Sequence, residues 1–167
     1  DLGGYLYISH CDLDRGIAIL RSATEDAGTW QVVNEPGMDG SAANSTAIVD
    51  GATPYNGALY VAVGNRSAGA RVWRTTGRLG ADGRVDWEPV GGPGLDNGAN
   101  AYAELGVYKG YLYAWTSNYE SGQQMLRTAC PIVQVAPISG PGAGRLCLRA
   151  ACAALLDRAD APTLMRS

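Results

Sequence analysis

The sequence predicts an all-β protein built from a repeated unit. Three segments that begin with glycine and continue as a short apolar and tyrosine-containing run recur at intervals of 53 residues. A second short run, which contains an arginine, follows each of them at the same interval. A period of this length is typical of repeat architectures. The first runs are residues 4–8, 57–61 and 110–114, and the second runs are residues 19–22, 72–75 and 125–128.

Individual strands follow from alternation of side chains between turn residues. Runs rich in aromatic and β-branched residues, bounded by Gly, Asn and Asp, predict short strands. Four such strands per unit describe one blade of a β-propeller. We therefore expect a partial β-propeller of about two and a half four-stranded antiparallel blades over residues 1–142. The expected strands are 4–9, 17–22, 29–33 and 44–50, then 57–63, 70–75, 85–90 and 101–108, then 110–116 and 123–128.

A β-sandwich is the alternative architecture, because it also uses short strands at close spacing. Recurrence of the strands as a unit favours the propeller, since sandwich strands have no reason to repeat in this way. A closed propeller usually needs at least about four blades. The expected partners are therefore the remaining blades of a larger propeller or an oligomer partner that completes the ring. The chain begins at Asp1, which favours a removed leader or a piece of a longer protein.

The second copy carries the most complete pattern, in residues 56–61 (NGALYV), 71–77 (RVWRTTG) and 87–97 (WEPVGGPGLDN). This pattern resembles the sialidase-like propellers, the superfamily of the Asp-box or bacterial neuraminidase repeat, and in particular its uncharacterised bacterial members. Residues 24–30 (TEDAGTW) match the Asp-box with one residue missing, and residues 82–87 keep only its Asp, Gly and Trp. The resemblance covers residues 1 to about 128 and favours a secreted or cell-surface protein. It implies that Asp26 and Trp30 form a structural turn.

Arg21, Arg74 and Arg127 repeat at the same place in each copy. Sialidases bind a carboxylate with three arginines, but equivalent positions of successive blades lie around a ring and do not converge. We expect each arginine to pack its stem on its own sheet and to bond a neighbouring loop. The Arg-Ile-Pro signature of that family is absent, and no Tyr–Glu nucleophile pair can be assigned.

Composition excludes several other classes of function. The net charge is −3 and the basic residues are scattered, which argues against nucleic acid as a partner. No apolar run approaches the length of a membrane span. The single histidine and the cysteines, which form no CxxC motif, offer no ligand set for a metal, and no cofactor is predicted. One disulfide or ordinary thiols both remain open for Cys11, Cys130, Cys147 and Cys152.

Candidate ligand-binding residues come from loops, because function concentrates on loops held by a rigid scaffold. Asp12 and Asp14 also resemble the start of a Ca²⁺ loop, but Gly16 stands where a third oxygen ligand is needed. The expected ligand is a carbohydrate or a protein. The candidate ligand-binding residues are Asp12, Asp14, Arg66, Asp96, Asn97, Tyr119 and Glu120. Three further polar loop residues are considered with them, namely Asp39, Asn65 and Asn118.

These observations favour a non-catalytic propeller segment that acts as a ligand-binding or scaffolding module, related to glycans by the resemblance. The alternative is a fragment of a sialidase-like glycoside hydrolase whose catalytic residues lie on other blades.

The segment 143–167 departs from the repeat. Five small or apolar residues have helical spacing and predict a helix over residues 145–157. Two interpretations stay open: a helix that caps the last blade, or a terminus altered by a reading-frame slip after about residue 128, where the repeat ends. The five residues are Leu148, Ala151, Cys152, Leu155 and Leu156.

Overall fold

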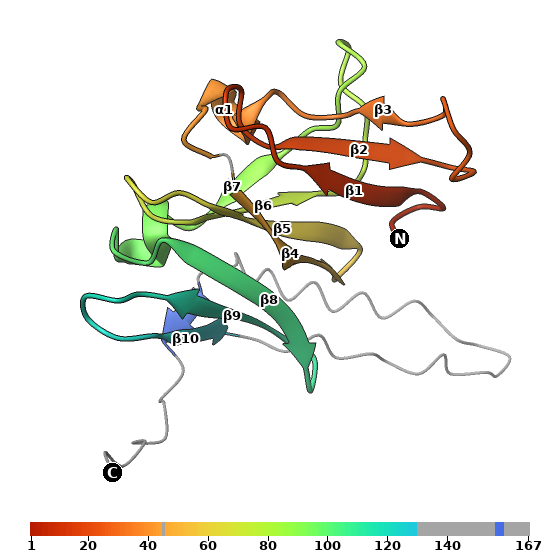
Figure 1. Ribbon diagram of the computed structural model, residues 1–167. Helices are drawn as coiled ribbons and strands as arrows, with labels where there is room; N and C mark the ends of the chain where they lie inside the picture. Colours follow the sequence, from red (N-terminus) through yellow and green to blue (C-terminus); the bar gives the residue numbers. More distant parts are fainter. Residues whose placement is uncertain (45, 130–155, 159–167) are drawn as a thin grey trace, which may run out of the picture.

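A computed structural model describes residues 1–44, 46–129 and 156–158. These residues form three antiparallel sheets that lie one above another (Figure 1). The first sheet contains β1 (Leu6–His10), β2 (Ala18–Ser22) and β3 (Gln31–Val32). The second contains β4 (Thr46–Tyr55), β5 (Ala58–Gly64), β6 (Arg71–Thr75) and β7 (Glu88–Val90). The third contains β8 (Tyr102–Tyr108), β9 (Tyr111–Ser117), β10 (Met125–Thr128) and β11 (Leu156–Arg158).

The all-β prediction is confirmed, and each expected strand has its counterpart, but the expected grouping of strands into blades is wrong. β4 and β8 were expected to end a blade, whereas each one begins the next sheet. The reason is the two-residue turns Asn56–Gly57 and Lys109–Gly110, in which every φ is positive, between 48° and 79°. This is the geometry of type I′ turns, which hold two strands as a tight hairpin. Each turn therefore ties the strand before it to the sheet after it.

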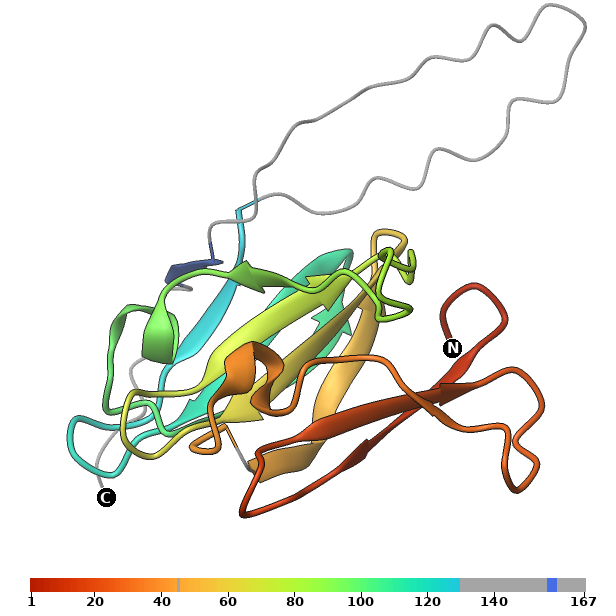
Figure 2. The ribbon, with the colours of Figure 1, turned by 90° about the horizontal axis from the view of Figure 1, so that it is seen from above.

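Longer connections carry the chain from one sheet to the next. The connection from β3 to β4 contains the short helix α1 (Gly37–Gly40), and the connection from β7 to β8 contains the 3₁₀ turn η1 (Pro93–Asp96). A Pro-Gly pair stands at the start of each, with Pro36 just before α1 and Pro93 as the first residue of η1, and both contain left-handed residues, with φ of 71° at Met38 and 53° at Leu95. Seen from above, the second and third sheets overlap, whereas the first sheet lies largely beside the second (Figure 2).

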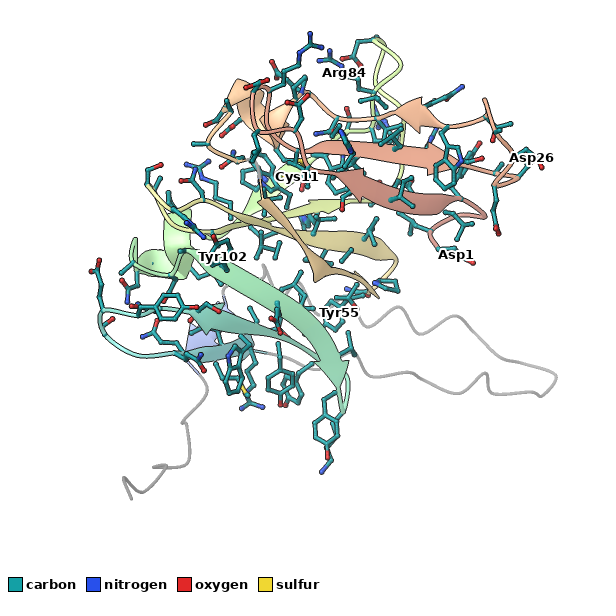
Figure 3. All side chains as sticks on the ribbon, in the orientation of Figure 1. Asp1, Cys11, Asp26, Tyr55, Arg84 and Tyr102 are labelled. Atoms are coloured by element: carbon teal, nitrogen blue, oxygen red, sulfur yellow. The ribbon has the colours of Figure 1, made fainter. Side chains whose placement is uncertain are left out.

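Two apolar layers hold the three sheets together, and side chains fill the spaces between them (Figure 3). Every residue of β5 is buried, because the second sheet is covered on both faces. One layer joins the first two sheets through Ile17, Ile19, Val33, Met38, Leu59, Val61, Val63, Trp73 and Val85. The other joins the second and third through Tyr55, Ala58, Tyr60, Ala62, Ala70, Val72, Val90, Leu95, Ala103, Leu112, Ala114 and Leu126.

The three sheets do not close into a ring within the described part of the chain, because no strand joins the first sheet to the third. The helix expected over residues 145–157 is contradicted at its end, where Leu156 begins β11 and pairs with Thr128. The rest of that helix, and the boundary at residue 142, lie outside the described residues. None of the described helices is long and apolar enough to cross a membrane.

Candidate functional site

The predicted loop residues gather at one end of the stack of sheets (Figure 1). This end is formed by the β1–β2, β5–β6 and β9–β10 loops together with α1 and η1. The turn between β2 and β3, which contains Asp26, lies at the opposite end, as the positions of Cys11 and Asp26 show (Figure 3). The structure therefore brings the candidate residues into one region, although they come from all three sheets.

Asp12, Asn65 and Asn118 are equivalent residues, 53 positions apart, and each fixes its loop. The side-chain oxygen of each accepts hydrogen bonds from the backbone N–H groups two and three residues later, at 2.9–3.0 Å. These turns are an ordinary use of Asp and Asn side chains. The two hydrogen bonds, from Asp14 and Arg15, also hold the pKa of Asp12 below its ordinary value.

Two of these asparagines also connect neighbouring sheets. The amide of Asn65 donates to the side-chain oxygen of Asn44 at 2.7 Å, and the amide of Asn118 donates to that of Asn100 at 2.9 Å. All four side chains are buried. The amide of Asn44 donates in turn to the carbonyl of Gly37 in α1, and the amide of Asn100 donates to the carbonyl of Gly94 in η1, at 2.8 Å in both cases. Each pair thus fixes a hairpin loop against the preceding connection.

Glycines at the same end allow the backbones of two loops to touch. A Cβ atom on Gly16 would lie 2.6 Å from Cα of Gly37, and one on Gly69 would lie 2.6 Å from Cα of Gly94. Both Gly16 and Gly69 have a φ of +89°, which other residues rarely adopt. These contacts and the asparagine pairs give most of the loop end a structural role.

The other predicted residues remain on the surface of this end. Arg66 lies over the ring of Tyr102, with its Cζ 5.5 Å from the ring centroid, and its Nε donates to the tyrosine hydroxyl. Asn97 donates to the Oγ of Ser121 at 3.2 Å and so links two loops. Asp14, Asp96, Tyr119 and Glu120 are exposed. Among the described residues, no group of three or more His, Cys, Asp and Glu side chains could hold a metal ion.

A groove of about 310 Å³ lies at the opposite end of the second sheet, and the sequence analysis did not predict it. Its volume is at the lower limit of small-molecule sites, which begin at roughly 300 Å³. Its lining is mostly polar and comes from the β4–β5 turn, the strands β5 to β7 and the β6–β7 connection. The described residues that line it are Asn56, Ala58, Tyr60, Arg74, Thr75, Thr76, Arg78, Asp86 and Glu88.

Arg74 is the central side chain of this groove. Its Nε and Nη2 donate to one oxygen of Glu88, at 3.0 and 2.8 Å. The pKa of Arg74 lies above its ordinary value because of the hydrogen bond to Glu88 and a further one to Tyr60. The second ion pair of the groove, between Arg78 and Asp86, is looser at 3.7 Å.

The equivalent arginines have different partners. Arg21 donates to the carbonyl of Gly77 on the β6–β7 connection at 3.2 Å, which confirms the expected bond to a neighbouring loop for this residue. Arg74 bonds its own sheet through Glu88, and Arg127 lies over the ring of Tyr111.

The turn at residues 24–30 is held by main-chain and hydroxyl groups. Its hydrogen bonds use the main-chain carbonyl of Asp26, which accepts from both the N–H and the hydroxyl of Thr29, at 3.2 and 2.7 Å. The hydroxyl of Ser22 pairs with that of Thr29 at 2.6 Å. The carboxylate of Asp26 is not the acceptor in these bonds.

Of the four cysteines, Cys11 is exposed, and Cys130, Cys147 and Cys152 lie outside the described residues. No family model, no curated protein and no solved structure matches this chain.

Proposed function

We propose that the chain is a segment of a β-propeller-type repeat protein and acts as a non-catalytic scaffolding and binding module. In this proposal its two outer sheet faces receive further sheets of the same repeat. A ligand then binds to the assembled scaffold, and a carbohydrate is the class that the resemblance to Asp-box proteins suggests.

The observation that carries the proposal is the outer face of the first sheet. Ile8 on this face is 47% exposed, but the equivalent Val61 is 5% exposed where the first sheet covers the second. Ile8 pairs with Leu20, and Leu20 pairs with Val32, so an apolar row crosses the whole sheet. Its position in the repeat is that of a buried interface, and an apolar face of this kind marks an interaction site.

The outer face of the third sheet is the matching half of such an interface. Trp115 is 41% exposed there, but the equivalent Ala62 is 1% exposed where the second sheet meets the third. Tyr113 and Met125 belong to the same outer face, since their equivalents Tyr60 and Val72 lie in the inner apolar layer. The two outer faces thus correspond to the two sides of one internal interface. Contacts between them would be heterologous, joining one end of a segment to the opposite end of the next.

The arginines favour the scaffold over the sialidase-like hydrolase. Arg21 binds a carbonyl of the β6–β7 connection, Arg74 binds Glu88 of its own sheet, and Arg127 lies over Tyr111, so the three arginines do not form one carboxylate site. Turnover of a fluorogenic sialoside by the purified chain would contradict the non-catalytic assignment. We expect no turnover above that of the Arg74→Ala variant.

The scaffold is tested by sedimentation of the chain over a range of concentrations. We expect reversible association of the wild type, weakened at least tenfold by either Ile8→Lys or Trp115→Lys, since each puts a charge in an apolar interface. Thr24→Lys, at an exposed turn, is the control that leaves association unchanged.

Mixing the two interface variants tests the head-to-tail arrangement. Each variant keeps one intact face, so the mixture should form a dimer that neither variant forms alone. A wild type that stays monomeric, or a mixture that stays monomeric, contradicts the proposal.

A further inference from the structure

A tyrosine ring lies on the repeated arginine in two of the three copies. The guanidinium carbon of Arg21 is 4.3 Å from the ring centroid of Tyr5, and that of Arg127 is 4.4 Å from the ring centroid of Tyr111. In both copies the tyrosine precedes the arginine by 16 residues, on the same face of the sheet. Since the first and third sheets have different neighbours, the stacked ring is a property of the repeat unit itself.

The second copy has the arginine without the ring. Ala58 stands at the position of Tyr5 and Tyr111, and it lines the groove together with Arg74. The Arg74 side chain is 44% exposed, whereas Arg21 is buried, because its face of the first sheet packs on the second sheet. The groove is therefore next to the guanidinium at the place where the other copies hold a phenol.

Glu88 orients the bare guanidinium. Two donors of Arg74 bind the same Glu88 oxygen, so they fix the plane of the group and leave its faces available. A guanidinium is planar and weakly hydrated, and it stacks readily on aromatic faces. Asn56, Thr75 and Thr76 supply polar groups around the groove for a hydroxyl substituent.

We propose that this groove binds the phenol ring of a ligand, stacked on Arg74 in the place that Tyr5 and Tyr111 occupy in their own copies. The chemical class is a small molecule or a peptide side chain with a para-hydroxylated aromatic ring. The groove selects such a ring because the second copy lacks its own.

The direct test follows the Nε–Hε signal of Arg74 by ¹⁵N-edited NMR while N-acetyltyrosinamide is added to the whole chain. We expect a saturable upfield shift from the ring current, with a dissociation constant on the order of 1 mM for one small ring.

p-Cresol should act at the same site, which shows that the ring alone suffices. A tyrosine-containing tripeptide that binds at least tenfold more tightly than both identifies a peptide as the better source of the ring, and equal affinity identifies the free phenol. N-acetylleucinamide and methyl glucoside are the non-aromatic controls. Binding of the glucoside in preference to the phenol overturns the proposal, as does a flat titration.

Substitutions that exchange the copies complete the test. Ala58→Tyr should fill the groove, shift the Arg74 signal upfield without ligand, and weaken binding at least tenfold. The converse variant, Tyr111→Ala, should expose Arg127 and add a second binding site of similar affinity. If Ala58→Tyr does not fold, Arg74→Lys keeps the charge but removes the stacking plane, and it should weaken binding several-fold. Because this variant lacks the Arg74 signal, its binding is followed by the backbone amide signals of Thr75 and Thr76. Unchanged affinity in either Ala58→Tyr or Arg74→Lys overturns the proposal.

Discussion

The amide of Asn65 donates a buried hydrogen bond of 2.7 Å to the side-chain oxygen of Asn44, and this bond joins the hairpin loop of the second sheet to the connection that leaves the first. The same bond recurs one repeat later between Asn118 and Asn100. Asn65 also accepts two backbone hydrogen bonds within its own loop. A single side chain therefore orders a turn and fixes the position of one sheet against the next.

Asn65→Asp should separate these two roles. The carboxylate keeps the acceptor for the turn but cannot donate to Asn44, and it places a charge beside a buried oxygen. We expect a loss of about 2–4 kcal/mol in the free energy of unfolding, measured by urea denaturation. The control is Asp12→Asn at the equivalent position, where the described side-chain hydrogen bonds stay within the loop, so the substitution should change that free energy much less. Equal effects of the two substitutions would contradict the assigned role of the pair.

Gly69→Ala should be much more destabilising than Gly122→Ala. The two glycines have nearly the same φ, +89° and +90°, so the conformational strain is the same. A Cβ at position 69 would meet the Gly94 backbone at 2.6 Å, whereas one at position 122 has no atom within 4 Å. We expect a loss of about 1–2 kcal/mol at position 122 from strain alone. At position 69 the loss should exceed about 3 kcal/mol, since rigid backbone must also move. Thermal unfolding of both variants checks the difference.

The turn at Asp12 should depend on pH below the ordinary aspartate pKa of 3.8. Backbone hydrogen bonds from Asp14 and Arg15 lower the pKa of Asp12 in the folded chain, so its ionised form stabilises the turn. A lowered folded pKa means that this stabilisation is present above 3.8 and is lost as the pH falls through the lower folded value. The amide chemical shifts of Asp14 and Arg15 should therefore titrate with a midpoint below 3.8. Asp12→Asn should remove that titration, and a midpoint above 3.8 would disprove the explanation.

Trp73→Ala should destabilise the chain strongly, because this ring belongs to the apolar layer between the first and second sheets. Truncation of a buried tryptophan costs about 3–5 kcal/mol. Trp115→Ala is the matched control on the outer face of the third sheet, and it should cost less than about 1 kcal/mol in the monomer. Chemical denaturation at low protein concentration makes the comparison, since association would otherwise protect Trp115.

The repeat could be predicted from the sequence because the strands depend on interactions between residues close in the chain. Alternating side chains and Gly-containing turns define each strand within a few residues, and the 53-residue interval then places Asp12, Asn65 and Asn118 in register. The candidate residues were selected from loops at either end, and whether any of them binds a ligand stays a prediction. Their division into structural and exposed residues was not readable, since whether Asn65 meets Asn44 depends on how two sheets pack.

The groove was missed although its signal is present in the printed sequence. The second copy has Ala58 at the position where the first and third copies have a tyrosine. An alanine in a strand carries no functional group, so sequence reasoning does not select it as a functional residue. The functional significance of Ala58 follows only from the structure, in which the rings of Tyr5 and Tyr111 lie on Arg21 and Arg127. That stacking joins residues 16 positions apart across a hairpin, and alternation of side chains does not predict it.

The sequence by itself determined that this protein is made of short antiparallel strands in repeated units, because side-chain alternation and turn preference act over a few neighbouring residues. Only the tertiary structure decided which strands share a sheet. The positive φ angles at Asn56 and Lys109 bind β4 and β8 into tight hairpins with the strands that follow, which moves each of them to the next sheet. Packing of those sheets, and no local pattern, then left the faces around Ile8 and Trp115 uncovered.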